Sequence, residues 1–153
     1  MHEIKEIHQI DLKNDICNRI LRDLPNWFGD ESAILNYIEK TQDMQFWSMF
    51  DNGEPIAFIA LKDHNQYTAE IYVMGVLEEY HRQGIGRELI ETAEEFYIKR
   101  NMKYLTLKTL DESRQSDSYE RTRKFYLSMG FLPLYWDKDN PCLIMAKYIA
   151  KEI

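Results

Sequence analysis

The sequence predicts one α/β domain of the mixed α+β kind, in which a central sheet of six to seven strands is flanked by about four helices. Three observations support this fold class. An Asn-Gly pair separates two apolar runs, a β-rich segment enters a glycine-rich turn that opens a helix, and two further β-rich segments close the chain. With 153 residues, 44% of them hydrophobic, the chain suits a single domain spanning residues 1–153.

The N-terminal part is predicted to form a strand and two helices. Residues 2–10 alternate weakly in polarity, which predicts a first strand, and Asp11 is placed to cap the helix that follows. The segment 25–30 breaks this helix, and Asp30 or Ser32 begins the next one. We expect this loop and its helix to form a lid or a pocket wall.

A hairpin and a third strand come next. The runs 46–50 and 56–61 flank Asn52-Gly53, and Asn-Gly is the strongest short-range signal for a hairpin turn. A third strand is predicted over 68–76, and it leads directly into the glycine-rich turn.

The glycine-rich turn is the clearest chemical signal in the chain. Gly84 and Gly86 lack a Cβ, so the backbone can turn sharply and bring N–H groups close to a ligand. The amphipathic helix that follows, ending near Asn101, adds the positive end of its dipole and favours a pyrophosphate. A glycine pair alone also fits a tight turn without a ligand. Because a β-rich run at 104–110 follows, the strands on either side of this helix are expected to be parallel.

The C-terminal part is predicted to contain one helix and two closing strands. Ser118 can cap a helix that runs through Met129, and Gly130 is a natural residue to follow its end. The closing strands are predicted over 131–136 and 143–148. The last strand is apolar enough for a homodimer interface, although closure of the sheet within one chain explains its composition equally well.

Composition narrows the function classes. The chain has 26 acidic and 19 basic side chains, a net charge of −7, which argues against nucleic acid and anionic membranes as partners and suits a cationic amine. Cys17 and Cys142 lack metal-ligand spacing, so we expect free buried thiols and no metal. The first twenty residues lack the apolar core of a signal peptide, and a cytoplasmic protein is expected.

Three motifs make the chain resemble the GNAT superfamily, the acetyl-CoA-dependent N-acetyltransferases. The first is Gly84-Ile85-Gly86 in the turn, with His81 where family members carry Arg or Gln. The second is Phe125-Tyr126, followed after three residues by Gly130-Phe131. The third is Glu70 on the strand before the turn, which resembles the strand with a catalytic glutamate in histone acetyltransferases. The resemblance covers essentially the whole chain and implies a partly splayed sheet.

The resemblance implies acetyl-CoA as co-substrate, held in a gap between the strand 68–76 and the strand 104–110. Main-chain groups of Met74, Gly75 and Val76 would pair with the pantetheine arm, and the glycine-rich turn would hold the pyrophosphate. The turn residues implied are His81, Arg82, Gln83, Gly84, Ile85, Gly86 and Arg87. Tyr119 occupies a position where many relatives carry an asparagine that contacts the cofactor.

The resemblance also implies Tyr126 as the acid that protonates the departing thiolate and Glu70 as the base, acting through water, for the acceptor ammonium. Each residue has a structural alternative, a packed aromatic for Tyr126 and a solvated strand residue for Glu70. Some relatives use a glutamate on the following strand, but that position here is Lys108, which cannot replace a carboxylate. Asp111 and Glu112 lie just beyond and could relay a proton through water.

Candidate acceptor-binding residues come from the first loop and from the strand that carries Glu70. Trp27, Phe28 and Asp30 occupy the region that walls the acceptor site in relatives, and Tyr72 lies two residues after Glu70. Such residues can attract a cationic amine and stack on it. The loop residues also fit an ordinary capped helix start with two half-buried rings.

The function predicted is transfer of an acetyl group from acetyl-CoA to a primary amine of a small molecule or peptide, without a metal. One alternative keeps the fold but makes it a non-catalytic acyl-CoA-binding regulatory module. A less favoured alternative is an acetyltransferase acting on a protein N-terminus or on a tRNA or ribosomal target, for which the basic residues Arg121, Arg123 and Lys124 speak.

Overall fold

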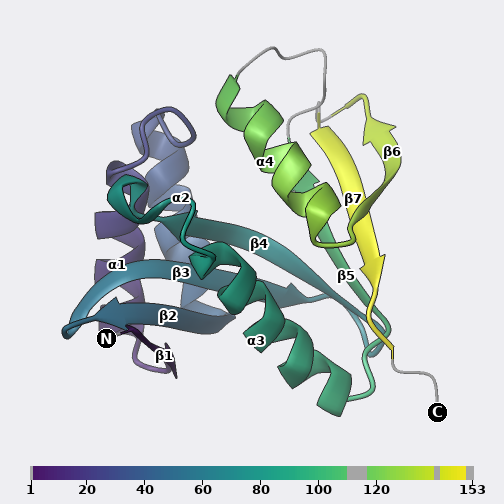
Figure 1. Ribbon diagram of the computed structural model, residues 1–153, viewed down its shortest axis with the longest axis horizontal. Helices are drawn as coiled ribbons and strands as arrows, with labels where there is room; N and C mark the ends of the chain where they lie inside the picture. The colour runs from purple at the N-terminus through teal and green to yellow at the C-terminus, as the bar shows by residue number, and fades with distance from the viewer. Residues whose placement is uncertain (1, 110–116, 140–141, 151–153) are drawn as a thin grey trace.

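The computed structural model describes residues 2–109, 117–139 and 142–150 and has the predicted α+β architecture (Figure 1). Seven strands form one sheet in the order β1-β2-β3-β4-β5-β7-β6. The strands are β1 His2–Glu6, β2 Gln45–Asp51, β3 Glu54–Asp63, β4 Thr68–Val76, β5 Tyr104–Thr109, β6 Leu132–Asp137 and β7 Cys142–Tyr148. As predicted, β4 and β5 are parallel, and the other neighbouring pairs are antiparallel.

The described part of the chain contains four α-helices, which cover both faces of the sheet. They are α1 Ile10–Arg22, α2 Glu31–Lys40, α3 Ile85–Lys99 and α4 Asp117–Ser128. Figure 1 shows α1 and α2 on one side of the strands β2 to β4 and α3 on the other, with α4 beside β5 and β7. None of these helices combines the length and the apolar composition needed to cross a membrane.

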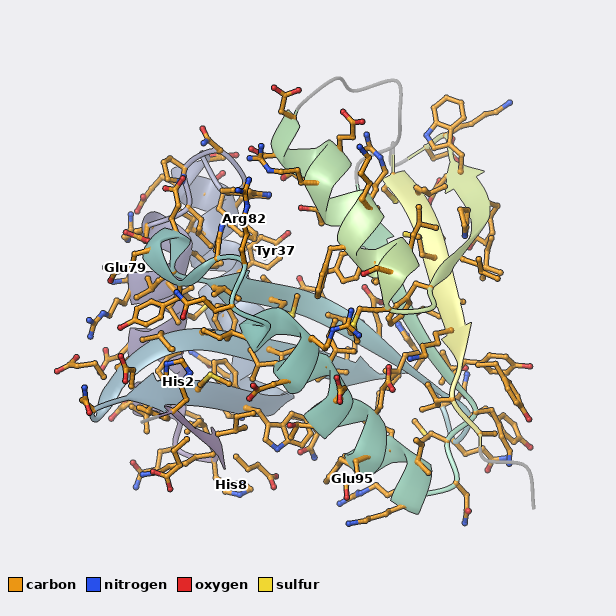
Figure 2. The ribbon with its side chains drawn as sticks, viewed as in Figure 1. His2, His8, Tyr37, Glu79, Arg82 and Glu95 are labelled. Carbon is orange, nitrogen blue, oxygen red and sulfur yellow. The ribbon has the colours of Figure 1, made fainter. Side chains whose placement is uncertain are left out.

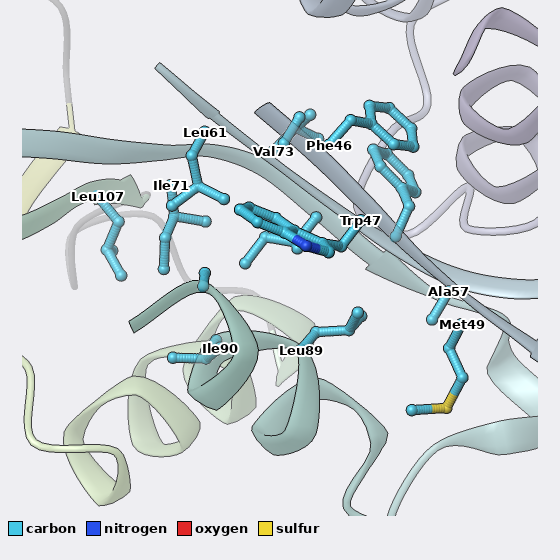
Figure 3. Packing of buried hydrophobic residues seen from close by; sticks show 14 of the residues in the cluster. Phe46, Trp47, Met49, Ala57, Leu61, Ile71, Val73, Leu89, Ile90 and Leu107 are labelled. Carbon is cyan, nitrogen blue, oxygen red and sulfur yellow. The ribbon is translucent and has the colours of Figure 1, made fainter. Parts of the chain in front are cut away.

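One part of the buried core lies between the sheet and α3, and another lies under the buried face of α1. Trp47 of β2 and Ile71 of β4 pack toward Leu89 and Ile90 of α3, and all four side chains are nearly inaccessible (Figure 3). Burial of apolar surface on this scale contributes about 25 cal/mol per Å² and is the main force holding the helix on the sheet. The C-terminal end of β4 and the N-terminal end of α3 are thereby fixed relative to one another.

The predicted hairpin is confirmed. Asn52 and Gly53 have φ angles of 51° and 84°, the two positive values that a type I′ turn requires, and β2 and β3 pair antiparallel on either side. The start of α2 is also as predicted, because the Asp30 carboxylate accepts a hydrogen bond from the Ser32 N–H at 3.1 Å.

The predicted start of α1 is wrong. The N-cap residue is Gln9, whose side chain makes no capping bond, and Asp11 lies inside the first turn. An aspartate is favourable both as a cap and in the first turn, where its charge faces the helix dipole, so its presence does not distinguish the two positions. The first strand is also shorter than predicted and ends at Glu6.

The end of α4 is predicted correctly, but its start is not. Gly130 has φ 96°, and the N–H of Phe131 donates to the Tyr126 carbonyl at 3.1 Å, the long bond of a Schellman motif. Ser118, predicted to cap the helix, is a buried residue within it, and its carbonyl accepts a hydrogen bond from the Thr122 hydroxyl. A serine in a first turn and a serine at a cap give the same sequence pattern.

The sheet splays between β4 and β5, as the resemblance implied. Their register runs only from Thr68 opposite Tyr104 to Ile71 opposite Leu107. On the other side of β4, Tyr72 has no partner in the register with β3, because Ala60 is opposite Val73 and Leu61 is opposite Ile71. This irregularity is a bulge in β4, and it bends the strand. The half of β4 beyond Ile71 therefore presents backbone groups toward a gap.

The apolar last strand is explained by sheet closure within the chain. β7 pairs with β5 on one side and with β6 on the other. The edge of the sheet is β6, whose exposed large side chains are Leu132, Leu134, Tyr135 and Trp136.

Candidate active site

A groove of about 1190 Å³ follows the gap between β4 and β5. Its walls come from both faces of the sheet. Tyr72 of β4 contacts Tyr37 of α2 on one face, whereas Met74 lies close to Gly86 of α3 on the other. The groove thus passes through the sheet where the strands part, and a molecule bound on one face can react with a second molecule on the other.

The glycine-rich turn forms one end of the groove. Arg82 and Gly84 have φ angles of 65° and 78°, and Gly84 is the N-cap of α3. The Glu88 N–H makes the first intrahelical bond, to the Gly84 carbonyl at 3.1 Å. The preceding N–H groups of the first turn have no acceptor within the helix, so this end of α3 can donate hydrogen bonds to an anion.

Gly86 is required by close packing between α3 and α4. A Cβ at this position would lie 3.2 Å from the Cζ atom of Phe125, which is closer than nearly all real contacts of this kind. The missing side chain lets α4 approach the turn and form the far wall of the groove.

Glu70 lies near the apex of the gap and lines the groove. Its side chain is 8% exposed, and its Oε1 atom is 2.6 Å from Nε2 of His64, whose side chain is 38% exposed. Burial that deep requires a partner for the carboxylate, and the imidazole supplies one. The arrangement places a buried carboxylate at the groove, in contact with a more exposed histidine.

Tyr126 of α4 faces the groove from the opposite side. It is 8% exposed, and its ring packs against Phe125 and Phe131. Burial raises its pKa well above the ordinary value of tyrosine, so the hydroxyl keeps its proton at neutral pH. The ring is thus a packed aromatic that also lines the groove.

Trp27 fastens the loop between α1 and α2 to α4 across the groove. Its indole N–H donates to the Thr122 hydroxyl at 3.1 Å, and its carbonyl accepts a hydrogen bond from the Tyr119 hydroxyl at 2.7 Å. The ring of His81 packs edge-on against the indole, with 5.5 Å between the ring centroids. This set of contacts, the Trp27 clasp, forms a bridge over the groove.

Comparison with known proteins decides the family. The model of the Acetyltransferase (GNAT) family matches residues 13–131, well over half of the chain. The chain belongs to the GNAT family. A search of the curated proteins gives no significant match.

Solved structures show the same fold as this GNAT domain. PaiA N-acetyltransferase from Thermoplasma acidophilum, in complex with coenzyme A, has a TM-score of 0.77 and 21% identity over 97% of this chain and 99% of that one. The ribosomal-protein-S18-alanine N-acetyltransferase from Escherichia coli has a TM-score of 0.75 and 22% identity, covering 100% and 97%. The aminoglycoside 6′-N-acetyltransferase from Enterococcus faecium has a TM-score of 0.75 and 21% identity, covering 99% of each.

Most of the residues predicted for the GNAT site line this one groove. They are Trp27, Phe28, Glu70, Tyr72, Met74, Gly75, Val76, His81, Arg82, Gly84, Ile85, Gly86, Arg87, Tyr119 and Tyr126. Two predicted residues do not line it. Gln83 is exposed and reaches the Glu79 carbonyl at 3.5 Å, and Asp30 caps α2. Asp111 and Glu112 lie outside the described residues.

Two predicted cofactor contacts have their polar atoms engaged within the protein. His81 Nε2 lies 2.7 Å from the Val76 carbonyl, and the Tyr119 hydroxyl donates to Trp27. The His81 ring therefore holds the turn against the end of β4. In this GNAT domain the His81 side chain has a partner within the protein.

Other residues of the site had no signal that marked them in the sequence. His64, Tyr37 and Thr122 belong to this group. Tyr37 and Thr122 reach the site through contacts with residues distant in the chain, and His64 through a contact with Glu70, six positions away. Only Tyr37 had a pattern, its helical spacing, which indicates a buried face and nothing about a site. Cys17 and Cys142 are buried and form no disulfide, and the described residues include no group of three His, Cys, Asp or Glu side chains placed to hold a metal ion.

Proposed function

We propose that this GNAT protein transfers the acetyl group of acetyl-CoA to a primary amine of a small molecule or peptide. The observation that carries the proposal is the single groove that joins an anion-binding helix terminus, the open edge of β4, Glu70 and Tyr126. Direct acyl transfer from a thioester that carries a pyrophosphate requires a site for the phosphates, a surface for the extended arm, a base and an acid. These four components supply them.

The residues present fit coenzyme A. The N-terminus of α3 suits the pyrophosphate, and Arg82, Arg87 and Arg121 line the same groove in a protein whose net charge is −7. The free backbone edge of β4 at Met74 and Val76 suits an extended arm with amide groups, because such an arm can pair like a strand.

The Thr109 hydroxyl gives an independent sign of a ligand. It lines the groove, and among the described residues its oxygen is a buried polar atom without a hydrogen-bond partner. Unpaired buried hydroxyls are uncommon and costly, so a bound molecule with a polar group at this place would satisfy it. The acetyl-CoA arm is the candidate.

The acceptor side is aromatic. Tyr37 is in edge contact with Tyr72 and with Phe28, both at 5.6 Å between ring centroids, and all three rings line the groove near Glu70. Such rings stabilise a cation and pack on its apolar body, while the carboxylate attracts the ammonium. This wall supports an amine acceptor.

The chemistry follows from the residues in their places. Glu70 takes a proton from the acceptor ammonium, directly or through water, and the freed amine attacks the thioester carbon. A backbone N–H near Val76 stabilises the negative charge that develops on the carbonyl oxygen. The carbon–sulfur bond then breaks, and Tyr126 donates its hydroxyl proton to the thiolate. The second proton lost by the attacking nitrogen returns, through water, to the Tyr126 phenolate.

Titration calorimetry with acetyl-CoA, followed by thiol release with a panel of amines, tests the proposal. We expect saturable binding and release of one thiol for each amide formed with at least one of the monoamines, polyamines, amino acids or peptides. A folded sample that does not bind acetyl-CoA would contradict the proposed function. Binding without transfer to any amine would favour the regulatory module.

A further inference from the structure

His64 contacts the proposed base and has no role in the reaction described so far. Its imidazole Nε2 is 2.6 Å from Oε1 of Glu70, and its position is fixed by the hairpin between β3 and β4. The backbone N–H of His64 donates to the Thr68 carbonyl at 2.9 Å. The Asn65 side chain accepts hydrogen bonds from the backbone N–H groups of Tyr67 and Thr68. The contact is therefore a built feature of the hairpin.

The reaction requires a path for one proton. A primary ammonium becomes a neutral amide and loses two protons, of which one stays on the released thiol. The other is left on Glu70 and must leave before the next turnover. Because Glu70 is 8% exposed whereas His64 is 38% exposed, water reaches the imidazole far more easily than the carboxylate.

We infer that His64 is the outlet through which Glu70 passes this proton to solvent, an inference that rests on the proposed function. In the resting pair the imidazole donates its Nε2–H to the Glu70 carboxylate. Once Glu70 is protonated, exchange with water moves the imidazole proton to Nδ1, and Nε2 accepts the Glu70 proton across the 2.6 Å contact. The imidazolium then releases one proton to water on its exposed side, and Glu70 is again a carboxylate. Histidine suits this step because its ordinary pKa lies close to neutral pH. His64 acts through Glu70 and touches no substrate.

The other titratable groups around the pair do not offer the same path. Lys62 is opposite Glu70 in the β3–β4 register, and Lys108 lines the groove from β5, but both are cations at neutral pH. Among the described residues, Asp63, Tyr37 and Tyr72 also lie near the pair. Asp63 accepts a hydrogen bond from the Tyr97 hydroxyl, and burial raises the pKa of both Tyr37 and Tyr72.

The test compares the first turnover with later ones. Glu70 begins as a carboxylate, so His64→Gln is expected to leave the first acetyl transfer unchanged while the steady rate falls about a hundredfold, which produces a burst of thiol. In His64→Ala, added imidazole is expected to restore the steady rate in proportion to its concentration, after subtraction of a blank without enzyme. Thermal midpoints of both variants establish that they are folded.

His8→Ala is the matched control. His8 lies 3.6 Å from Glu6 in a similar pair, but it does not line the groove, and Figure 2 shows it on the side of the molecule away from Arg82 and Tyr37. This variant should keep the wild-type rate and ignore imidazole. An unchanged steady rate in His64→Gln overturns the inference, and so does an equal slowing of first and later turnovers without rescue, which would make His64 a support for Glu70 only. An inactive wild type would instead contradict the proposed function.

Discussion

At Tyr126 the fold buries a hydroxyl that carries a proton at neutral pH. The buried ring packs on Phe125 and Phe131, and the raised pKa keeps the hydroxyl protonated at neutral pH. Tyr126→Phe removes this proton and leaves the packing in place. We expect kcat to fall on the order of a hundredfold with acetyl-CoA binding essentially unchanged, as measured by thiol release and calorimetry.

Glu70→Gln is the companion variant. It keeps the shape of the side chain and can still hydrogen-bond His64, but an amide cannot accept the proton. If thiol release with a competent amine survives both substitutions undiminished, the assignment of acid and base is wrong, and water alone manages the protons.

Cys17 predicts how stability depends on alkaline pH. Burial raises the pKa of this thiol from 9.0 to about 12, outweighing a hydrogen bond with Thr41 that lowers it. A raised pKa means that the contribution to stability is complete below pH 9.0 and is lost as the pH rises toward about 12. The loss is up to about 1.4 kcal/mol per pH unit.

Urea unfolding of the wild type and of Cys17→Ala at several pH values measures this contribution. The wild type should lose its advantage over the variant as the pH rises above 9.0, because only the wild type carries the thiol. Subtracting the unfolding free energy of the variant from that of the wild type at each pH cancels the contributions of the lysines and tyrosines that both proteins contain. Parallel curves would show that the thiol ionises equally well in the folded protein.

At the scale of elements, the junction between α3 and α4 controls the shape of the anion site. Gly86→Ala places a methyl group 3.2 Å from the Phe125 ring, so α4 must shift away from the turn. We expect the acetyl-CoA Kd to rise about tenfold, although alanine itself favours the helix by about 1 kcal/mol. Calorimetry measures the change.

A second substitution checks the cause. In Gly86→Ala with Phe125→Leu, the ring atom that the methyl group would meet is absent, and most of the affinity lost in Gly86→Ala should return, relative to Phe125→Leu alone. Purely additive losses in this double-mutant cycle would mean that the glycine acts through the backbone and not through its closeness to α4.

The elements themselves could be predicted where their signals are local. Asn52-Gly53 determines a hairpin and Gly130 ends a helix, because the turn needs positive φ angles at two adjacent residues and the helix end needs one. The caps at Asp11 and Ser118 were predicted wrongly, since the cap and the first turn favour the same residue types.

The contacts of the site could not be predicted in this way. The Tyr119 hydroxyl reaches Trp27 across 92 positions, and the Thr122 hydroxyl accepts from the Trp27 indole across 95. His64 lies only six positions from Glu70, yet their contact depends on the exact register of the β3–β4 hairpin. A polar side chain in a loop has no periodicity, so nothing in the sequence singles out its partner.

At the scale of the whole molecule, the sheet is two parts joined at a narrow place. The strands β1 to β4 and the strands β5 to β7 meet through the short β4–β5 register, which ends at Ile71, and the Trp27 clasp ties α4 to the N-terminal part. A ligand in the gap contacts both parts. Its binding free energy therefore adds to the cohesion of the fold.

Acetyl-CoA should consequently raise the thermal midpoint. At a ligand concentration about a hundredfold above Kd the folded state gains about 2.7 kcal/mol, which for a chain of this size is a rise of about 5 to 10 °C. ADP carries the pyrophosphate without the pantetheine arm, so it can occupy the α3 terminus but cannot bridge β4 and β5. We expect ADP, at the same concentration, to give a clearly smaller rise in differential scanning fluorimetry. Equal rises would mean that the anion site alone accounts for binding and that the open edge of β4 takes no part.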